Sequence, residues 1–253
     1  MRVLVTRPAA QAAEWVADLR ASGLDAVSLP LIAIAPVDDL APLRAAWQTL
    51  PQQHLAVFVS PNAAQHFFAA RPPGQTWPVT TLAASPGPGT TQALVALGVP
   101  VSQVIEPAAD AAQFDSEALW QQLMLHRWQD ADVLIVRGDG GRDWLADTLR
   151  EHGARIAHLA AYRRAAPRLD ADERTALRAA LASPQTHLWF FSSSEAIANL
   201  QTLVPPGTGW AGARAIGTHP RIVATARQCG FADVVESRPA LAAVVACIQS
   251  IAT

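Results

Sequence analysis

The chain contains a single tyrosine, Tyr162, in the stretch AAYRRAAPR, where arginines follow it directly. A phenol can donate a proton or a hydrogen bond to a departing group, and guanidinium groups bind carboxylates and phosphates. Two interpretations are open on these residues alone. Tyr162 is either a core aromatic with its hydroxyl turned to solvent, or the acid–base group of a site that handles a polyanion.

Serine and glycine turns recur where short apolar runs give way to helical segments. FVSPNAA places Ser60 and Asn62 at such a turn, FFSSSEA places Ser192–Ser194, and SPGPGTT includes Thr90. Serines at these points are natural helix N-caps, and a capping role needs no ligand. The same termini offer backbone N–H groups and a positive dipole end, which favour a bound carboxylate or phosphate.

Several kinds of site are excluded. All nineteen basic residues are arginines, so a Schiff base or a phosphate-loop lysine is impossible. The turns GPGTTQ and RGDGGR lack the dinucleotide G-x-G-x-x-G spacing, and the chain has no G-x-S-x-G elbow. The seven histidines and two cysteines show no metal-ligand spacing. We therefore expect no metal and no cofactor.

The composition indicates a globular protein with a large core. Of the 253 residues 51% are hydrophobic and 16% are charged, and this length suits one large domain or two ordinary ones. The net charge of −2 argues against a nucleic-acid partner. The cysteine usage, the N-terminal strand without a signal-peptide core and the lack of a long apolar run predict a cytoplasmic protein without membrane association.

Short β-branched runs alternate with helical segments, which predicts strand–helix units and parallel sheets. We expect strands at residues 2–6, 26–29, 55–60, 79–83, 101–105, 132–137, 155–160, 187–192, 213–217 and 232–236. That is about twice what one doubly wound sheet needs, so two domains are expected.

Internal similarity indicates where the domains divide. VLVTRPAAQAAEWVADL parallels VLIVRGDGGRDWLADTL, with Arg7 and Arg137 ending the strands, and the serine and glycine turns form further pairs. In one copy the arginine strand comes first, and in the other it comes last. We therefore expect an inserted domain at 38–160, a discontinuous domain of 1–31 plus 170–253, and linker strands at 32–37 and 161–169. The alternative, consecutive domains split near 125–130, would leave each with a half-set of motifs.

These segments together resemble the uroporphyrinogen-III synthase family over nearly the full chain. The resemblance rests on VLVTRPAAQ, FVSPNAA, GPGTTQAL, LIVRGDGGRDWLADTLREHGA, AAYRR, FFSSSEAIANL and ARAIGTHPRIVATARQCGF. It implies two similar flavodoxin-like α/β domains joined by a two-stranded linker, the first discontinuous. Because ligands of parallel sheets bind at the carboxyl ends of the strands, we expect both sets of turns to line one cleft beside Tyr162.

The resemblance also implies a reaction. The substrate would be hydroxymethylbilane, a linear tetrapyrrole polycarboxylate, which loses its terminal hydroxyl as water and closes through a spiro intermediate with ring D inverted. Tyr162 would be catalytic, assisting the departing hydroxyl. The residues implied to bind substrate are Arg7, Ser60, Asn62, Thr90, Arg137, Gly138, Arg142, Ser192, Ser193, Ser194, Thr218, His219 and Arg221. Many relatives have a Gly-Pro-Thr turn where this chain has GTHPR. Thr218, His219 and Arg221 are therefore assigned only because they lie near the position of that threonine.

We expect a monomer that makes transient contact with the preceding pathway enzyme. Two other function classes remain open. A two-lobed small-molecule binding protein would have the same two crossings between lobes. A nucleotide-sugar transferase would need acidic metal-binding residues at a strand end, for which Asp139 is the only candidate.

Overall fold

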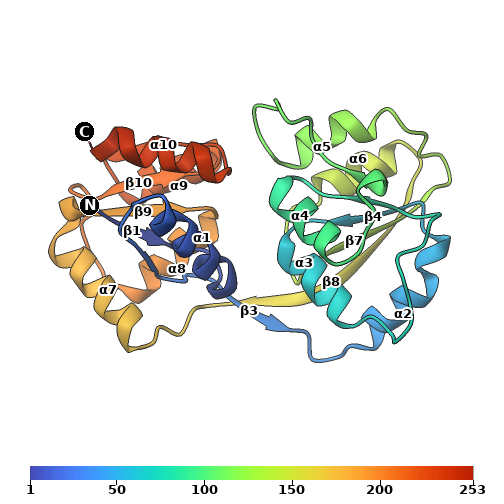
Figure 1. Cartoon of the computed structure of the whole chain (residues 1–253), viewed down its shortest axis with the longest axis horizontal. Coiled ribbons are helices and arrows are strands. Elements are labelled where there is room, and N and C mark those ends of the chain that lie inside the picture. Colours follow the sequence, from blue (N-terminus) through green and yellow to red (C-terminus); the bar gives the residue numbers. More distant parts are fainter. Residues whose placement is uncertain (253) are drawn as a thin grey trace. The chain divides into compact units, whose positions relative to one another are not determined.

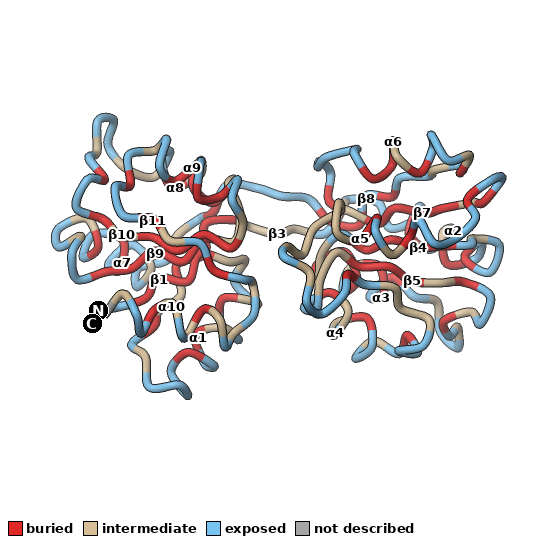
Figure 2. Tube along the Cα trace, turned by 90° about the horizontal axis from the view of Figure 1, so that it is seen from above, coloured by how far each residue is buried: buried red, intermediate tan, exposed pale blue. Residues whose placement is uncertain are grey.

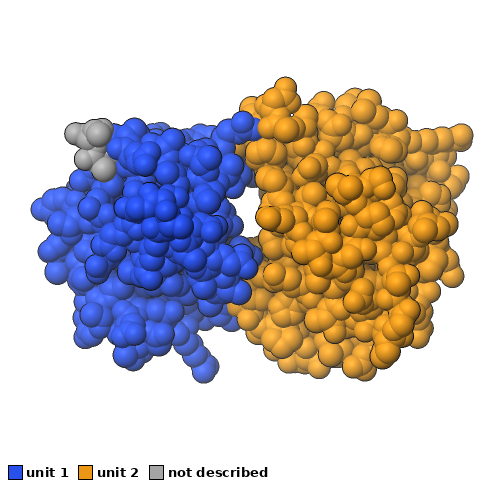
Figure 3. Space-filling view, in the orientation of Figure 1, with its two compact units in different colours: residues 1–33, 165–253 blue, residues 34–164 orange. Residues whose placement is uncertain are grey.

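The computed structural model describes residues 1–252, with side chains to residue 251. The chain forms two compact units. Unit 1 comprises Met1–Ala33 and the chain from Ala165 onward, and unit 2 comprises Ile34–Arg164 (Figure 3). Each unit is one sheet with helices on its faces (Figure 1). The expected fold class, two α/β domains with parallel sheets, is confirmed.

The sheet of unit 1 is parallel throughout its assigned pairs. Its strands are β1 (Arg2–Val5), β2 (Ala26–Ser28), β9 (His187–Phe191), β10 (Arg214–Gly217) and β11 (Asp233–Glu236). Their order is β11-β10-β9-β1-β2. This is the flavodoxin-like order, in which the winding reverses between β1 and β9, and such a switch point is the usual ligand position.

Helices cover both faces of this sheet. They are α1 (Ala9–Ala21), α7 (Ala171–Ala182), α8 (Ser194–Leu203), α9 (Pro220–Cys229) and α10 (Leu241–Ala252), with a 3-10 turn η3 (Pro184–Thr186). Helices α1 and α10 lie on one face and α8 and α9 on the other (Figure 2). On the first face Val3, Val5 and Phe190 of the strands pack with Val16 and Val244 of the helices. The apolar runs of the strands are therefore buried on two sides, as parallel strands require.

Unit 2 has the larger sheet. Its strands are β3 (Ala33–Pro36), β4 (Leu55–Phe58), β5 (Leu82–Ala84), β6 (Val104–Ile105), β7 (Asp132–Gly138) and β8 (Arg155–Ala165). Their order is β3-β8-β7-β4-β5-β6. The pairs from β8 to β6 are parallel.

Two separate cores flank the sheet of unit 2. Its helices are α2 (Ala41–Thr49), α3 (Pro61–Ala69), α4 (Pro88–Ala96), α5 (Ser116–Leu123) and α6 (Trp144–Glu151), with 3-10 turns η1 (Leu50–Gln52) and η2 (Val101–Gln103). Trp47 of α2 and Phe67 of α3 belong to the core that also holds Tyr162. Trp120 of α5 and Leu149 of α6 belong to the core on the other face.

The strand orders match the internal repeat. The sequence pairs β1 with β7, β9 with β4 and β10 with β5, and in both sheets the paired strands take equivalent places. The order β11-β10-β9-β1-β2 thus corresponds to β6-β5-β4-β7-β8. Unit 2 is a circularly permuted copy in which β7 and β8 come last.

Two expectations about elements need correction. The strand expected at 79–83 begins only at Leu82, because the Trp77 indole nitrogen donates to the Thr81 carbonyl (2.9 Å) and closes a turn there. Residues 101–103 form η2 rather than strand.

The segments expected as linker strands, 32–37 and 161–169, contain extended chain. Strand β3 lies within the first segment and is bonded to β8, which continues into the second segment as far as Ala165.

Candidate functional site

Tyr162 lies inside unit 2, within β8 rather than on a free linker. Its side chain is 1% exposed and belongs to a hydrophobic core. The phenol oxygen lies 3.1 Å from Ser60 Oγ, and the Arg164 Nη2 donates to it at 3.4 Å. The ring is therefore a core aromatic, but its hydroxyl is bonded to polar side chains rather than turned to solvent. The acid–base role of Tyr162 stays a prediction.

The ring of Tyr162 fits against a glycine. Gly138 of β7 is the register partner of Tyr162, across an irregularity that follows Arg137. A Cβ atom on Gly138 would lie 3.0 Å from the tyrosine Cε2 and 3.1 Å from Cζ, which is closer than ordinary van der Waals contact. Gly138 was expected to bind substrate, and the structure shows a different requirement for glycine at this position: the missing side chain leaves room for the phenol.

Ser60 and His66 of α3 complete the surroundings of the phenol. Ser60 is the N-cap of α3, and its Oγ accepts from the Ala63 amide at 3.2 Å, as its sequence position predicted. The His66 ring stacks on Tyr162 with centroids 5.8 Å apart. Burial lowers the pKa of His66, so the imidazole is neutral at neutral pH. Asn62, also expected at this turn, lies buried in the first turn of α3.

The glycine turn of unit 2 is held by a chain of hydroxyl groups. Thr91 Oγ1 donates to Glu106 Oε2 (2.7 Å) and lies 2.7 Å from Ser85 Oγ. Thr90, the residue expected from the sequence, is buried in α4. The sequence motifs did not indicate Ser85, Thr91 or Glu106 as part of this turn. Glu106 directly follows β6, so an inspection of every strand end would have found it.

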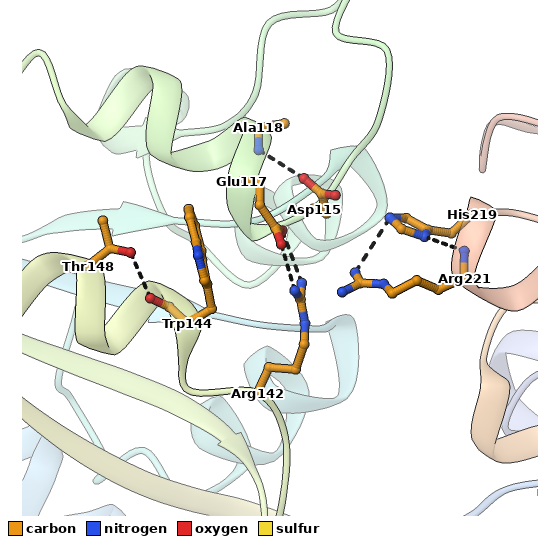
Figure 4. Close-up of polar contacts among 8 residues, drawn as sticks. All are labelled: Asp115, Glu117, Ala118, Arg142, Trp144, Thr148, His219 and Arg221. Carbon is orange, nitrogen blue, oxygen red and sulfur yellow. Dashed lines mark hydrogen bonds and ion pairs between the residues drawn. The ribbon is translucent and has the colours of Figure 1, made fainter.

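The two arginines expected to bind substrate in unit 2 are engaged by carboxylates. Arg137 Nη1 donates to Asp143 Oδ1 at 2.5 Å. Arg142 makes a bidentate pair with Glu117, at 2.6 and 3.0 Å (Figure 4). The hydrogen bonds that Arg142 donates to Glu117 raise the pKa of Arg142, and the hydrogen bond that Asp143 accepts from Arg137 lowers the pKa of Asp143. The positive charge of both arginines is thus largely balanced within unit 2.

Arg7 of unit 1 has no such partner. Its guanidinium carbon lies 4.6 Å from the ring centroid of Trp15 and 5.7 Å from that of Phe190. Its Nη1 donates to the Gln11 side chain at 3.3 Å. The Nε is buried and has no hydrogen-bond partner among the described residues. Burial lowers the pKa of Arg7 to about 10, so the group remains protonated at neutral pH.

The serine turn of unit 1 follows β9. Ser193 is the N-cap of α8, with its Oγ accepting from the Glu195 amide at 3.2 Å. Ser194 Oγ accepts from Thr225 of α9 at 3.1 Å. Ser192 is half-buried at the end of β9. The capping role predicted for these serines is confirmed for Ser193, and the turn joins α8 to α9.

The GTHPR turn of unit 1 is capped by its histidine. His219 Nδ1 accepts from the Arg221 amide at 3.1 Å, which makes His219 the N-cap of α9. The Arg221 guanidinium lies 3.5 Å from the His219 Nε2 (Figure 4). Thr218 is buried beside them. Histidine thus takes the place at the start of α9 that serine takes at the starts of α3 and α8.

Within residues 1–252 no group of three or more His, Cys, Asp or Glu side chains is arranged to hold a metal ion. None of the helices described in that range is long and apolar enough to cross a membrane.

Comparisons with known proteins agree on one family. Residues 13–246 match the family model described as uroporphyrinogen-III synthase HemD. The chain is 31% identical over 175 residues to the uroporphyrinogen-III synthase of Salmonella typhimurium, which covers 68% of this chain and 69% of the relative. It is 29% identical over 240 residues to that of Escherichia coli K12, covering 92% and 94%.

Two solved structures share the fold. A mutant uroporphyrinogen III synthase from the extremely thermophilic bacterium Thermus thermophilus aligns with a TM-score of 0.60 and 16% identity, covering 100% of this chain and 98% of the other. The Helicobacter pylori 26695 protein aligns with a TM-score of 0.60 and 14% identity, covering 99% and 100%. The family model spans most of the sequence and the relatives carry one name. The chain therefore belongs to the uroporphyrinogen-III synthase family.

Proposed function

We propose that this chain converts hydroxymethylbilane into uroporphyrinogen III, with loss of water and inversion of ring D, and that Tyr162 assists the loss of the hydroxyl. Family membership supports the overall reaction. The observation that supports the role of Tyr162 is its phenol oxygen, which contacts both Ser60 and Arg164 although the ring is buried.

Tyr162 acts on the terminal hydroxyl of the substrate. The phenol donates its proton as the carbon–oxygen bond breaks, and the bonding electrons leave with oxygen as water. What remains is an azafulvenium cation, balanced by the phenolate, and the substituted carbon of ring D forms its new bond to the methylene carbon of this cation. Arg164 then donates a hydrogen bond to the phenol oxygen.

The turns at the strand ends hold the acetate and propionate groups. Their backbone amides lie at helix N-termini, where the dipole favours anions. The residues proposed for this role are Ser60, Asn62, Thr90, Gly138, Ser192, Ser193, Ser194, Thr218, His219 and Arg221, with Arg7, Arg137 and Arg142 as charged partners. Fixing a flexible chain at several carboxylates also selects the geometry that inverts ring D, and such positioning is a major source of rate enhancement.

The reaction is redox-neutral and moves only protons, water and carbon–carbon bonds, so it requires no redox cofactor. We further propose a cytoplasmic monomer that takes its unstable substrate through transient contact with the enzyme that makes it. Light scattering at working concentration tests the monomer, and a mass above one chain contradicts it.

The isomer of the product tests the function. The protein is given freshly generated hydroxymethylbilane, and the oxidised porphyrins are separated by chromatography. We expect the type III isomer, whereas the control without enzyme yields type I. Type I alone in both samples contradicts the proposal. Tight binding of the substrate without turnover favours the two-lobed binding protein instead.

A further inference from the structure

Strand β8 contains a β-bulge directly before Tyr162. Arg137 of β7 pairs with Ala160, but the next residue of β7, Gly138, pairs with Tyr162, so Ala161 is an extra residue in β8. A bulge of this kind interrupts the alternation of side chains along a strand and turns the side chain that follows it. The position of the phenol therefore depends on the local geometry of β8.

The bulge decides which face of the sheet receives the phenol. Leu159 and Ala161 are buried in the core that also holds Phe67 of α3, whereas Ile156 packs against the core on the opposite face. In a regular strand Tyr162 would lie on the face of Ile156, because side chains alternate with a period of two. Its burial in the same core as Ala161 therefore results from the bulge.

A carboxylate fixes the chain on the far side of the bulge. The Arg164 amide donates to Asp139 Oδ1 at 3.2 Å, and Asp139 directly follows Gly138, the last residue of β7. The Asp139 side chain thus continues the bonding between the two strands beyond the end of β7. Tyr162 is held between the bulge on one side and this hydrogen bond on the other.

The side chain of Arg164 connects this hydrogen bond to the phenol. Tyr162 and Arg164 are two positions apart in β8, so their side chains lie on the same face. Arg164 Nη2 donates to the phenol oxygen at 3.4 Å, and the guanidinium carbon lies 6.0 Å from the centroid of the tyrosine ring. This contact requires the Arg164 backbone to stay where Asp139 holds it.

We infer that Asp139 is a positioning residue, whose carboxylate holds the Tyr162 hydroxyl in place through the Arg164 backbone and the bulge at Ala161. Ser60, which lies 3.1 Å from the phenol oxygen, belongs to the N-terminus of α3 and not to β8. A shift in the end of β8 would therefore separate the two hydroxyl groups. The consequence for catalysis rests on the proposed function, whereas the consequence for the position of the ring does not.

The first test needs no substrate. Tyr162 is the only tyrosine of the chain, so the ring signals in an NMR spectrum of protein labelled at tyrosine come from this residue alone. Asp139→Ala removes the acceptor of the Arg164 amide, and we expect the ring signals to shift. Unchanged signals in this variant would overturn the inference.

Asp39→Ala is the matched control. Asp39 is another exposed carboxylate of unit 2 that accepts from a backbone amide, that of Ala41 at 2.8 Å. Its loss should leave the signals of Tyr162 in place. Asp139 is exposed as well, so Asp139→Ala should fold with a Tm close to that of Asp39→Ala.

The second test is kinetic and uses freshly generated hydroxymethylbilane. Asp139→Ala should lower kcat about 10-fold, because a displaced hydroxyl loses part of its contribution, with KM within about twofold. Asp139→Asn keeps an oxygen that can accept from the Arg164 amide, so it should restore most of kcat. Equal impairment of Asp139→Asn and Asp139→Ala would contradict the inference, because it would mean that the charge of Asp139 matters and its hydrogen bond does not.

The double variant shows whether Asp139 acts through the phenol. In a Tyr162→Phe background the hydroxyl is already absent, so Asp139→Ala should lower kcat no further, as expected for coupled residues. A further 10-fold loss, or a wild-type kcat in the folded single variant Asp139→Ala, overturns the inference and leaves the proposed reaction intact. If the wild-type protein yields only the type I isomer, the proposed function fails, and the ring signals still decide whether Asp139 positions the phenol.

Discussion

The two units present the same arginine at the end of an equivalent strand, yet in different electrostatic surroundings. In unit 2 Asp143 neutralises Arg137. In unit 1 Glu14 takes the equivalent place, directly before the tryptophan of the following helix, but it is exposed and forms no ion pair with Arg7 among the described residues. A duplicated scaffold has thus kept a balanced charge in one copy and an unbalanced charge in the other.

The candidate acid–base group lies in unit 2, not in the unit that holds the unbalanced arginine. The phenol of Tyr162 and its partner Ser60 lie in unit 2, and unit 1 has no tyrosine because the chain contains only one. We therefore propose that unit 2 provides the group for bond breaking and that Arg7 of unit 1 contributes to carboxylate binding.

Among the single substitutions, Tyr162→Phe is expected to change the kinetics most. Loss of the phenol hydroxyl should lower kcat by about 100-fold, at the low end of general acid–base contributions, while KM changes little. The Tm should fall by only a few degrees, since the ring remains packed. A wild-type kcat in the folded variant would show that Tyr162 serves only in packing and that its hydroxyl takes no part in bond breaking.

Gly138→Ala should also impair kcat, by roughly tenfold, without touching a polar group. The added methyl group meets the Tyr162 ring at 3.0 Å and displaces the hydroxyl, with a cost of about 1–3 kcal/mol in unfolding free energy. Gly140→Ala is the matched control, because a Cβ there meets nothing within 4 Å. Equal kinetics for both variants would show that the position of the ring is not critical.

Asp143→Asn removes the ion pair of Arg137, so that the arginine at this strand end of unit 2 lacks a carboxylate partner, as Arg7 does in unit 1. Arg137 loses its carboxylate, so we expect KM for the polyanionic substrate to fall by about two- to fivefold, the range of a partly exposed ion pair. Asp147→Asn, which breaks the surface pair with Arg150 on the same helix, should have a smaller effect. Steady-state kinetics at constant ionic strength provide the measurement. A rise in KM would mean that the Arg137–Asp143 pair shapes the binding turn.

The smallest expected effect is an acid sensitivity that arises at His66. Burial lowers its pKa below the ordinary 6.5, so its contribution to stability is complete above pH 6.5 and is lost as pH falls toward the folded-state pKa. His66→Gln should flatten the decline of Tm below pH 6.5, whereas His126→Gln, at an exposed site, should not. Identical slopes in both variants would exclude His66 as the source.

The sequence predicted the architecture because the repeat preserves strand order. Matching Arg7 with Arg137 and the serine turns with each other was enough to locate the strand positions later seen in both sheets. Helix caps at Ser60 and Ser193 followed from local chemistry. Such features depend on neighbours in the chain, which a sequence displays directly.

Side-chain partners could not be predicted in the same way. Nothing local shows that Arg142 meets Glu117 across 25 positions, or that Arg7 folds onto Trp15 without a carboxylate. The burial of Tyr162 depends on Gly138, its partner in the neighbouring strand. These outcomes are decided by rotamers and tertiary contacts, which leave no periodic pattern in the sequence.

The most direct test of the division between units is to measure kcat and KM of Tyr162→Phe and Arg7→Gln side by side on freshly generated hydroxymethylbilane. We expect separate effects: kcat falls with KM nearly constant in the unit 2 variant, and KM rises with kcat nearly constant in the unit 1 variant. If both variants change the same parameter, or if either folded variant behaves as wild type, the division is contradicted.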